Sequence, residues 1–363
     1  MDVWRGVWKL NFSALYEGYH AMKNPAYRLK VGGTEIRTGE RAVLERLDCE
    51  MTSRKEAGYL LAQGVLNPDE KEGKSWLDAF QAGTECELSL GYDKDLKKVF
   101  TGFLYEVSWS DPLEDGAMEL QALFLDARGR LMTSSCADAG AARTLSQMVK
   151  TILTQSYVKK LASSQKISPA PKDWDLPVQR PGDSDYQVVC EAAEFLCYEF
   201  YVCGEELYLG EPRPDSSPIV TFDGVTGLTR LRRSRTLASQ CAAVTVSGTD
   251  DKGERIQARQ ARKKDSGFGT DRMASALSND IHIPEETVRT MAQAKYLAQA
   301  RMEQRQHQAG KLEGTCLGIP ELRPGRFIKT EKCSKPVCGT FYVHTVRHRL
   351  SSSGYLTEFE AEE

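Results

Sequence analysis

The amino-acid sequence predicts a mainly β protein in which two β-rich parts flank an α+β part. Three observations lead to this fold class. Apolar and polar residues alternate in the first third of the chain, helix-capping patterns precede apolar stripes in the middle, and alternation returns in the last third. A period of two places successive side chains on opposite faces of a strand, whereas spacings of three and four residues build one face of a helix.

Five stretches of the first third have the alternation or the β-forming residues of strands. They are residues 27–31, 42–51, 85–90, 99–107 and 118–124. Turns rich in glycine, aspartate and proline separate them, a pattern that is typical of an antiparallel barrel or sandwich. The short segment Trp76–Phe80 predicts one helical turn between two of the strands.

Two helices are predicted in the middle of the chain. Thr144 and Gln147 have the spacing of a capping box, and so do Ser184 and Gln187. In a capping box the two side chains bond backbone N–H groups that the first helical turn leaves free. Apolar residues at helical spacing follow each pair, which predicts one buried face for each helix.

The chain between and after these helices has other patterns. Residues 162–182 are rich in serine, proline and lysine, which predicts a loop. A hairpin follows, with strands at 198–202 and 207–209 around a turn at Gly204. Two helices with a hairpin make the middle of the chain an α+β part.

Strands return in the last third, with one long helix among them. The strand-like stretches are residues 219–222, 242–247, 311–317, 342–348 and 355–359. Residues 249–280 are polar and contain glycine, which predicts an irregular excursion. Pro284 and the two glutamates after it predict a helix over 285–309, because proline suits a first turn and acids suit its positive end. The sequence has no strict internal repeat.

Composition narrows the class of protein. The 363 residues carry a net charge of -3, with 40% hydrophobic and 27% charged residues, as in globular proteins of two or three domains. A small net charge argues against nucleic acid as the primary ligand. No run of about 18 apolar residues occurs, so no membrane insertion is expected. The N-terminus lacks the basic and apolar regions of a secretory signal.

Ten cysteines are spread along the chain, several of them beside apolar residues, as Cys197 is. A chain without an export signal is expected to fold in a reducing compartment. Buried thiols stay reduced there and pack as small apolar groups. The sequence therefore predicts free thiols rather than a disulfide framework.

The metal candidate consists of Cys333, Cys338, His344 and His348. Thiolate and imidazole are both good zinc ligands, and the two histidines are expected on one face of a strand. However, five residues between the cysteine pair and the histidine pair are far fewer than a zinc finger has there. No metal is the main prediction, and zinc at these four residues is the open alternative.

Catalytic motifs are weak. No glycine-rich nucleophile turn surrounds any cysteine, and ten cysteines with five histidines make chance pairs unavoidable. The paired carboxylates of a muramidase have no local pattern here. Gly267–Asp271 follows two lysines but lacks the strand and helix that flank a phosphate-binding loop. The sequence therefore predicts no catalytic residue and no cofactor.

Two groups of basic residues remain. They comprise Arg230, Arg232, Arg233 and Arg235 in one stretch and Arg259, Arg262, Lys263 and Lys264 in another. No aromatic residues alternate with these charges, as they do where single-stranded nucleic acid stacks on a protein. A solvated face or a subunit contact is therefore favoured over the lining of a DNA or cargo channel.

Several segments in a fixed order carry a family resemblance. They are Gly91-Tyr92 with Val99–Gly102, Ser184–Tyr186, Tyr198–Val202 with Leu207–Leu209, Gly318–Gly325 with Gly339–His348, and Gly354–Phe359. They resemble the early barrel motif, the helix with two strands, and the closing segment of the phage late control D proteins and of the hub part of VgrG spike proteins. The resemblance covers most of the chain.

The resemblance implies two tube-like antiparallel β-barrel domains plus a helix-containing connecting domain. Residues 1–134 are then the first tube-like domain, 135–215 the α+β connecting domain, and 216–363 the second tube-like domain with the excursion and the long helix. Such hubs are homotrimers, so that two similar domains in each of three chains form a pseudo-sixfold ring. The structural role implies no enzymatic activity.

The resemblance also implies partners and location. The expected partners are the tail tube protein, the spike protein, other baseplate proteins and the tape measure protein. Because the chain stops at Glu363 without the OB, β-helix or effector domains of VgrG, the spike is expected to be a separate protein. The chain is expected to be made in the bacterial cytoplasm and assembled into the tail or baseplate of a phage, bacteriocin or related contractile injection system.

Two alternatives of other classes stay open. One is a tail-associated cell-wall hydrolase or peptidase, which would need a catalytic constellation that no local pattern reveals. The other is a cargo-binding adaptor that uses residues 249–280.

Overall fold

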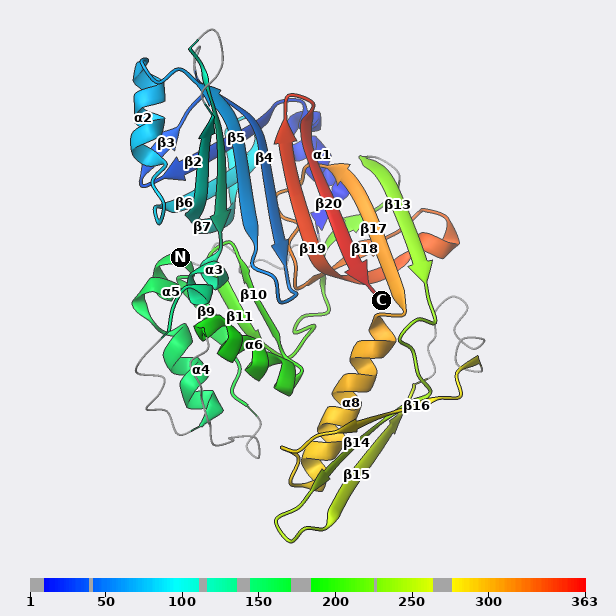
Figure 1. The fold of residues 1–363 in the computed structure, drawn as a ribbon. Coiled ribbons are helices and arrows are strands. Elements are labelled where there is room, and N and C mark those ends of the chain that lie inside the picture. The colour runs from blue at the N-terminus through cyan, green and yellow to red at the C-terminus, as the bar shows by residue number, and fades with distance from the viewer. Residues whose placement is uncertain are drawn as a thin grey trace.

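The structure, a computed structural model, describes residues 10–38, 42–110, 116–135, 144–170, 184–224, 227–263 and 276–363. Strands dominate, and helices lie mostly in the middle part and in one insertion, which confirms the predicted mainly β class with an α part (Figure 1). Among the described residues, no helix is both long and apolar enough to cross a membrane.

The first β unit consists of one folded antiparallel sheet with a helix against it. Its elements are β2 (Pro25–Val31), β3 (Thr34–Ile36), β4 (Ala42–Thr52), β5 (Tyr59–Leu66), α2 (Lys71–Ala79), β6 (Glu85–Tyr92), β7 (Asp95–Ser110) and β8 (Met118–Leu125). The long strand β7 pairs with β6 over its first half and with β8 over its second half. The sheet therefore turns a corner at Phe103, and the enclosed space is filled by Trp76, Phe80 and Phe124.

The second β unit consists of the last strands of the chain together with the start of the described chain. Its elements are β12 (Pro218–Phe222), β13 (Leu228–Arg235), β17 (Gly310–Leu317), β18 (Arg326–Thr330), η4 (Lys335–Val337), β19 (Gly339–Ser351) and β20 (Gly354–Glu362). The N-terminal elements β1 (Leu10–Asn11), α1 (Phe12–Gly18) and η1 (His20–Met22) precede the first unit in sequence. Nevertheless β1 pairs with β12, and Phe12 stacks on Phe222.

The two β units share one topology, although the sequence has no strict repeat. Strands β4, β5, β8 and β7 are neighbours in the first unit, as β13, β17, β20 and β19 are in the second. Bulges also recur. Glu45 in β4 and Thr229 in β13 fall at register shifts, and so do Tyr105 in β7 and His344 in β19. A bulge bends and twists a strand at one point, so both units curve in the same places.

The units join directly through their strands. Residues 46–52 of β4 pair antiparallel with residues 345–351 of β19. Eight strands, β7-β8-β5-β4-β19-β20-β17-β13, thus form one continuous sheet across the molecule (Figure 1). Ion pairs fasten the junction, since Arg347 pairs with Glu50 and Arg349 lies 3.1 Å from Asp48. One hydrophobic core extends through both units.

The middle part is an α+β unit, as predicted. It comprises α3 (Ala127–Met132), α4 (Leu145–Leu153), α5 (Ser156–Leu161), β9 (Ser164–Ile167), α6 (Asp185–Leu196), β10 (Glu199–Cys203) and β11 (Glu206–Gly210). Ser184 and Gln187 form the predicted capping box, and Thr144 accepts from the backbone N–H of Gln147. The loop prediction for 162–182 was wrong at its start. There β9 pairs in parallel with β11, a contact too distant in sequence to leave a local pattern.

An insertion between β13 and β17 forms a small separate layer. It comprises β14 (Ala243–Thr249), β15 (Arg255–Ala261), β16 (Asp280–Pro284) and α8 (Met291–His307), with the helix covering one face of a three-stranded sheet. The predicted irregular excursion over 249–280 was wrong where β15 pairs with β14. Polar residues alternate along β15 because only one of its faces is buried.

The long helix begins later than predicted. Pro284 ends β16 rather than opening the helix, and α8 starts after Thr290. Thr290 and Gln293 form a complete capping box, which satisfies the first free N–H groups of the helix. The sequence analysis took Pro284 as the start of the helix and missed the capping box that begins six residues later at Thr290.

Candidate functional site: a charged cavity where three parts meet

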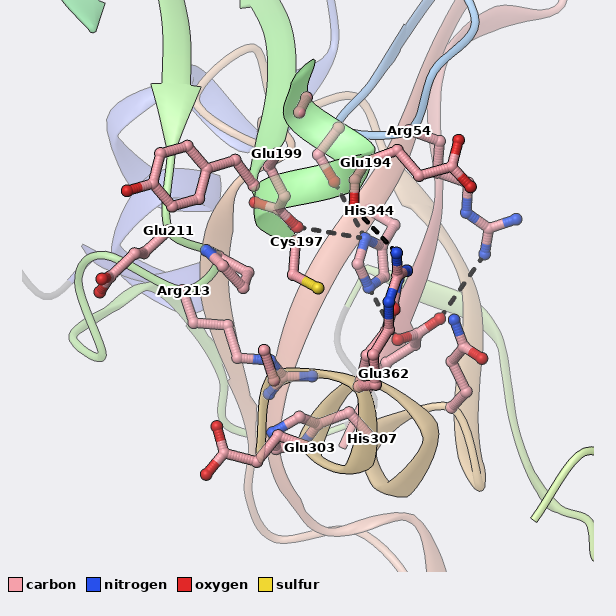
Figure 2. Close-up of a pocket in the computed structure, with 18 of the residues that line it drawn as sticks. Arg54, Glu194, Cys197, Glu199, Glu211, Arg213, Glu303, His307, His344 and Glu362 are labelled. Carbon is pink, nitrogen blue, oxygen red and sulfur yellow. Dashed lines mark hydrogen bonds and ion pairs between the residues drawn. The ribbon is translucent and has the colours of Figure 1, made fainter. Parts of the chain in front are cut away.

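A cavity lined by several charged side chains lies between the first β unit, the α+β part and the second β unit with its insertion (Figure 2). Its volume is about 910 Å³. One wall is the end of α6 with the start of β10, and the opposite wall is the second half of α8. The segment Ser53–Lys55 after β4 and the strands β19 and β20 complete the lining.

Glu199 is a largely buried acid of this cavity, with its side chain 13% exposed. It begins β10, and its carboxylate accepts a hydrogen bond from the Tyr342 hydroxyl, while His344 Nδ1 lies 4.0 Å away. Burial raises the pKa of Glu199 to about 7, and the nearby His344 and Tyr342 offset only part of that effect. Glu199 therefore changes its charge near neutral pH.

His344 lies between Glu199 and a second acid, Glu362. Its Nε2 is 2.9 Å from a Glu362 oxygen, and its Nδ1 is 2.9 Å from the Ser53 hydroxyl. Burial opposes the ionisation of Glu362, but the hydrogen bond from His344 and the charges of Arg54 and Arg213 outweigh it and lower its pKa. The bulge in β19 turns His344 into the cavity, out of the alternation of its strand.

Arg213 closes the cavity from the side of the linker between β11 and β12. Its guanidinium lies over the Tyr342 ring, 5.0 Å from the ring centre, and 5.7 Å from that of Phe327. Burial lowers the pKa of Arg213, whereas Glu362 and Glu199 favour its charge. Its backbone has a positive φ of 61°, an uncommon conformation for arginine that tertiary contacts must hold.

In this arrangement the two carboxyl groups do not face each other across open space. A glycosidase needs two carboxyl groups that face each other across space for the sugar. Here the His344 imidazole stands between Glu199 and Glu362 and contacts both (Figure 2). The contacts of Glu199 with Tyr342 and His344 join the α+β part to the second β unit.

A second contact holds the α+β part on its other side, where a buried ion pair bonds the backbone of the first β unit. Arg128 is fully buried, and its guanidinium donates to Asp126 at 2.8 Å and to the backbone oxygen of Arg54 at 2.9 Å. Asp126 also accepts from the backbone N–H of Gly58 at 2.7 Å. A side chain at Gly58 would meet Asp126 Oδ2 at 2.8 Å, so this close approach requires glycine.

The structure separates the four residues of the metal candidate. Cys333 and Cys338 lie together in the loop between β18 and β19, with their sulfur atoms 3.4 Å apart. His344 faces the charged cavity, whereas His348 is buried beside Tyr355 and Thr357. The expectation that both histidines share a face was wrong, because the bulge at His344 shifts the alternation between them. Within the described ranges, no cluster of three or more such residues could hold a metal ion.

The cysteines that the structure describes are all free thiols. Cys49, Cys86, Cys241 and Cys316 are buried, and the other five described ones are half-buried. Burial raises the pKa of the Cys316 thiol and of the Cys49 thiol, so both stay protonated and act as apolar side chains. Cys136 lies outside the described residues.

The basic residues of the first group divide between two faces of β13. Arg233 and Arg235 turn inward and pair with Glu363, whereas Arg230 and Arg232 lie on the exposed face. In the second group Arg259 pairs with Asp280 and Lys263 with Glu303. Lys264 and the segment Gly267–Asp271 lie outside the described residues.

The ends of the eight-stranded sheet are open among the described residues. Strand β13 pairs only with β17, and residues 106–110 of β7 pair only with β8. Ser234 on β13 and Ser108 on β7 are exposed. Sheet edges with free N–H and C=O groups are sites at which further strands can pair.

Sequence reasoning singled out His344 but missed Glu199, Glu362 and Arg213. Glu199 lies 143 positions before Tyr342, and His344 and Glu362 come from different strands, so no local spacing indicates the network. The only signal was indirect: a glutamate among the apolar residues of a strand.

The fold thus defines a class of protein: two topologically equivalent β units joined in one sheet, with an α+β part between them in the chain. No protein-family model matches the sequence, and no curated protein sequence matches it either.

Solved structures identify the class more closely. A tail protein from Neisseria meningitidis MC58 is similar with a TM-score of 0.69 and 16% identity, over 94% of this chain and 97% of that one. The 43 kDa tail protein of prophage MuSo2 from Shewanella oneidensis has a TM-score of 0.65 and 14% identity, over 93% and 98%. A chain of the Francisella PdpA–VgrG complex has a TM-score of 0.53 and 7% identity, over 94% and 58%. The chain has the fold of phage tail and VgrG-related proteins, as the sequence resemblance implied.

Proposed function

We propose that this chain is a structural hub of a contractile injection system, a homotrimeric adaptor that joins a hexameric tail tube to a trimeric spike. In the proposal, residues 1–134 and 216–363 contain the two tube-like domains. Residues 135–215 are the connecting domain, against whose core α3, at the end of the first range, packs. The fold shared with phage tail proteins supports this role. One observation carries the proposal. The two strands that pair at the junction inside the chain have, as their counterparts in the other β unit, the two strands at the open edges of the sheet.

Inside the chain, the outer edge of β4 pairs with the second half of β19. By the shared topology, β13 is the counterpart of β4, and β7 is the counterpart of β19. These counterparts are the two open edges of the sheet. If β13 of one copy pairs with β7 of the next, the junction between chains repeats the junction within the chain, and identical contacts can close a ring.

The bulges fix the register of this proposed contact. Glu50 follows the bulge of β4 by five residues, and Ser234 follows that of β13 by five. Arg347 follows the bulge of β19 by three residues, and Ser108 follows that of β7 by three. Since Glu50 is paired with Arg347 within the chain, Ser234 is expected opposite Ser108 of the next copy.

The remaining parts of the proposal follow from this ring. The tail tube protein contacts one face, and the spike protein contacts the other. Other baseplate proteins and the tape measure protein are further partners. The chain is made in the bacterial cytoplasm, is assembled into a tail or baseplate, and has no enzymatic activity.

The first test is the solution mass of the purified chain, alone and with the neighbouring spike protein, by light scattering. A mass near three times 40.5 kDa, alone or in the complex, is the expected result. A chain that stays monomeric with every neighbouring tail protein would overturn the trimer.

The second test measures the register of the contact. The Ser108→Cys/Ser234→Cys variant is expected to give covalent oligomers with a short thiol-reactive cross-linker, because the two side chains then face each other between copies. Each single variant controls for the native cysteines. Glu35→Cys/Ser234→Cys is the matched control, since β3 is another sheet edge that the proposal leaves out of the contact. Cross-linking that is equal in both double variants contradicts the proposed register.

A wall-lysis assay tests the absence of enzymatic activity. The purified chain is expected to leave cell wall intact. Lysis by the wild type that Glu199→Gln abolishes would show that the charged cavity is a hydrolytic site and would replace the structural proposal.

A further inference from the structure

The loop between β18 and β19 contains two thiols in contact, at residues that the ionic network and the sheet edges do not use. The sulfur atoms of Cys333 and Cys338 are 3.4 Å apart, and Cys338 Sγ also lies 3.1 Å from the backbone oxygen of Cys333. A disulfide bond is about 2 Å long, so closure needs a shift of little more than an ångström. Only η4 lies between the two cysteines.

The loop is accessible to a small oxidant. Cys333 and Cys338 are half-buried, whereas Ser334, Lys335 and Pro336 between them are exposed. By contrast, Cys49, Cys86, Cys241 and Cys316 are buried in the cores. The two thiols therefore lie close together and are accessible to a small oxidant, unlike the buried cysteines.

We propose that Cys333 and Cys338 are an oxidation site: they form a disulfide that closes the β18–β19 loop when the protein meets a low-molecular-weight disulfide such as oxidised glutathione. This refines the sequence prediction of free thiols, which holds for the reduced protein. It does not rest on the proposed trimer.

The reaction is a double thiol–disulfide exchange. One cysteine thiolate attacks a sulfur of oxidised glutathione, which forms a mixed disulfide and releases one glutathione thiolate. The second cysteine thiolate then attacks the protein sulfur of the mixed disulfide, forms the internal S–S bond and releases the second glutathione. The cysteine pair loses two electrons and two protons, and oxidised glutathione gains them. Burial and the hydrogen bond with Cys338 raise the pKa of Cys333, so the exchange speeds up in mildly alkaline solution.

The bond has a structural consequence at the outermost strand. Arg233 of β13 donates to the backbone oxygen of Pro336 at 2.8 Å, and Thr330 donates to that of Val337 at 2.6 Å. A disulfide across residues 333–338 restricts the loop in the unfolded chain and holds Pro336 against β13 in the folded one.

Tryptic mass mapping after treatment of the folded, full-length chain tests the site directly. Trypsin cleaves after Lys332 and Arg347 but not between Lys335 and Pro336, so one peptide carries both cysteines and no other. After oxidised glutathione, this peptide is expected to be lighter by two hydrogen atoms. In Cys333→Ser or Cys338→Ser, the remaining thiol is expected to retain a glutathione adduct instead. A wild-type peptide that stays reduced or carries glutathione adducts would overturn the proposal.

Thermal unfolding supplies the second readout. Closure of so short a loop is expected to raise the Tm of the treated wild type by roughly 2–4 °C. The Tm of Cys333→Ser/Cys338→Ser is expected to stay unchanged after the same treatment. The Tm of Cys190→Ser, which lacks a half-buried cysteine elsewhere, is expected to rise as in the wild type. An equal rise in the double variant would assign the effect to another thiol.

Discussion

The α+β part is held to the β sheet at two places that differ in their access to water. On one side the Asp126–Arg128 pair is fully enclosed, and backbone groups of Gly58 and Arg54 complete its hydrogen bonds. On the other side Glu199 and His344 lie at the wall of a cavity of about 910 Å³. The segment Ser53–Lys55 touches both places, since the backbone of Arg54 contacts Arg128 while its side chain faces Glu362.

The two places both attach the α+β part to the β sheet, one with charges enclosed by protein and the other with charges at the wall of a cavity. In the enclosed pair each charge depends on a fixed partner, because removal of either one leaves an uncompensated charge without water. In the cavity the partners share several contacts, and Glu199 changes its protonation near pH 7. The first contact should govern the total stability, and the second should govern its dependence on pH.

The largest expected effect comes from Arg128→Ala. Asp126 would then be a buried carboxylate without its cation, which costs about 3–5 kcal/mol in the free energy of unfolding. Urea unfolding at neutral pH measures this loss.

Arg130→Ala is the matched control, because Arg130 is on the same helix but is exposed. It is expected to change the stability by less than about 1 kcal/mol. Equal losses in both variants would mean that α3 itself, and not the enclosed pair, carries the effect.

The next effect is a pH slope from Glu199. Its folded pKa of about 7 lies above the ordinary value of 4.5, so the folded state binds this proton more tightly than the unfolded state. The contribution is fully present below pH 4.5 and is lost as pH rises to 7, by roughly 3 kcal/mol. Glu199→Gln is expected to remove this contribution, so the stability difference between wild type and variant should fall by that amount from pH 4.5 to 7.5. If the variant has the same pH profile as the wild type, the raised pKa of Glu199 is contradicted.

His348 should give a slope of the opposite sign. Burial lowers its folded pKa to about 4 from 6.5, so the unfolded state binds this proton more tightly. Its contribution is present above pH 6.5 and is lost as pH falls to 4, also by roughly 3 kcal/mol. His348→Gln is expected to remove that loss. Because the two slopes oppose each other in the wild type, each single variant should have a steeper pH profile than the double variant with Glu199→Gln. Additivity is expected because, among the described residues, no hydrogen bond joins Glu199, which bonds Tyr342, to His348, which bonds Thr357 and Tyr355.

The smallest effect concerns the helix that forms the far wall of the cavity. Thr290→Ala removes the cap of α8 and should cost about 1 kcal/mol. Ser184→Ala, which removes the equivalent cap of α6, is the comparison. The rate of amide hydrogen exchange at residues 291–294 should rise only in Thr290→Ala. A rise in both would mean that the two helices open together.

Much of the fold could be predicted locally. The strands around Tyr27, Glu85 and Tyr355 follow from alternation, because each has one face in the core and one face away from it. The cap at Ser184 was also visible, since a capping box is complete within four residues. Strand β15 was missed, because its polar face gave it the composition of a loop.

The candidate site was much less predictable. His344 was noticed as a metal candidate, yet its orientation depends on a bulge, and the alternation of its strand predicted the opposite side. Glu199 and Glu362 meet at His344 from different strands, and nothing in either neighbourhood indicates the other.

By itself, then, the sequence determined where strands and capped helices form, because these depend on neighbours within a few residues. It also carried enough ordered motifs to point to the fold of tail hub proteins. Only the tertiary structure decided that β4 pairs with β19, that both β units bend at matching bulges, and which charges meet in the cavity. These contacts join residues up to about three hundred positions apart, so their partners are chosen by the packing of the whole chain rather than by any local pattern.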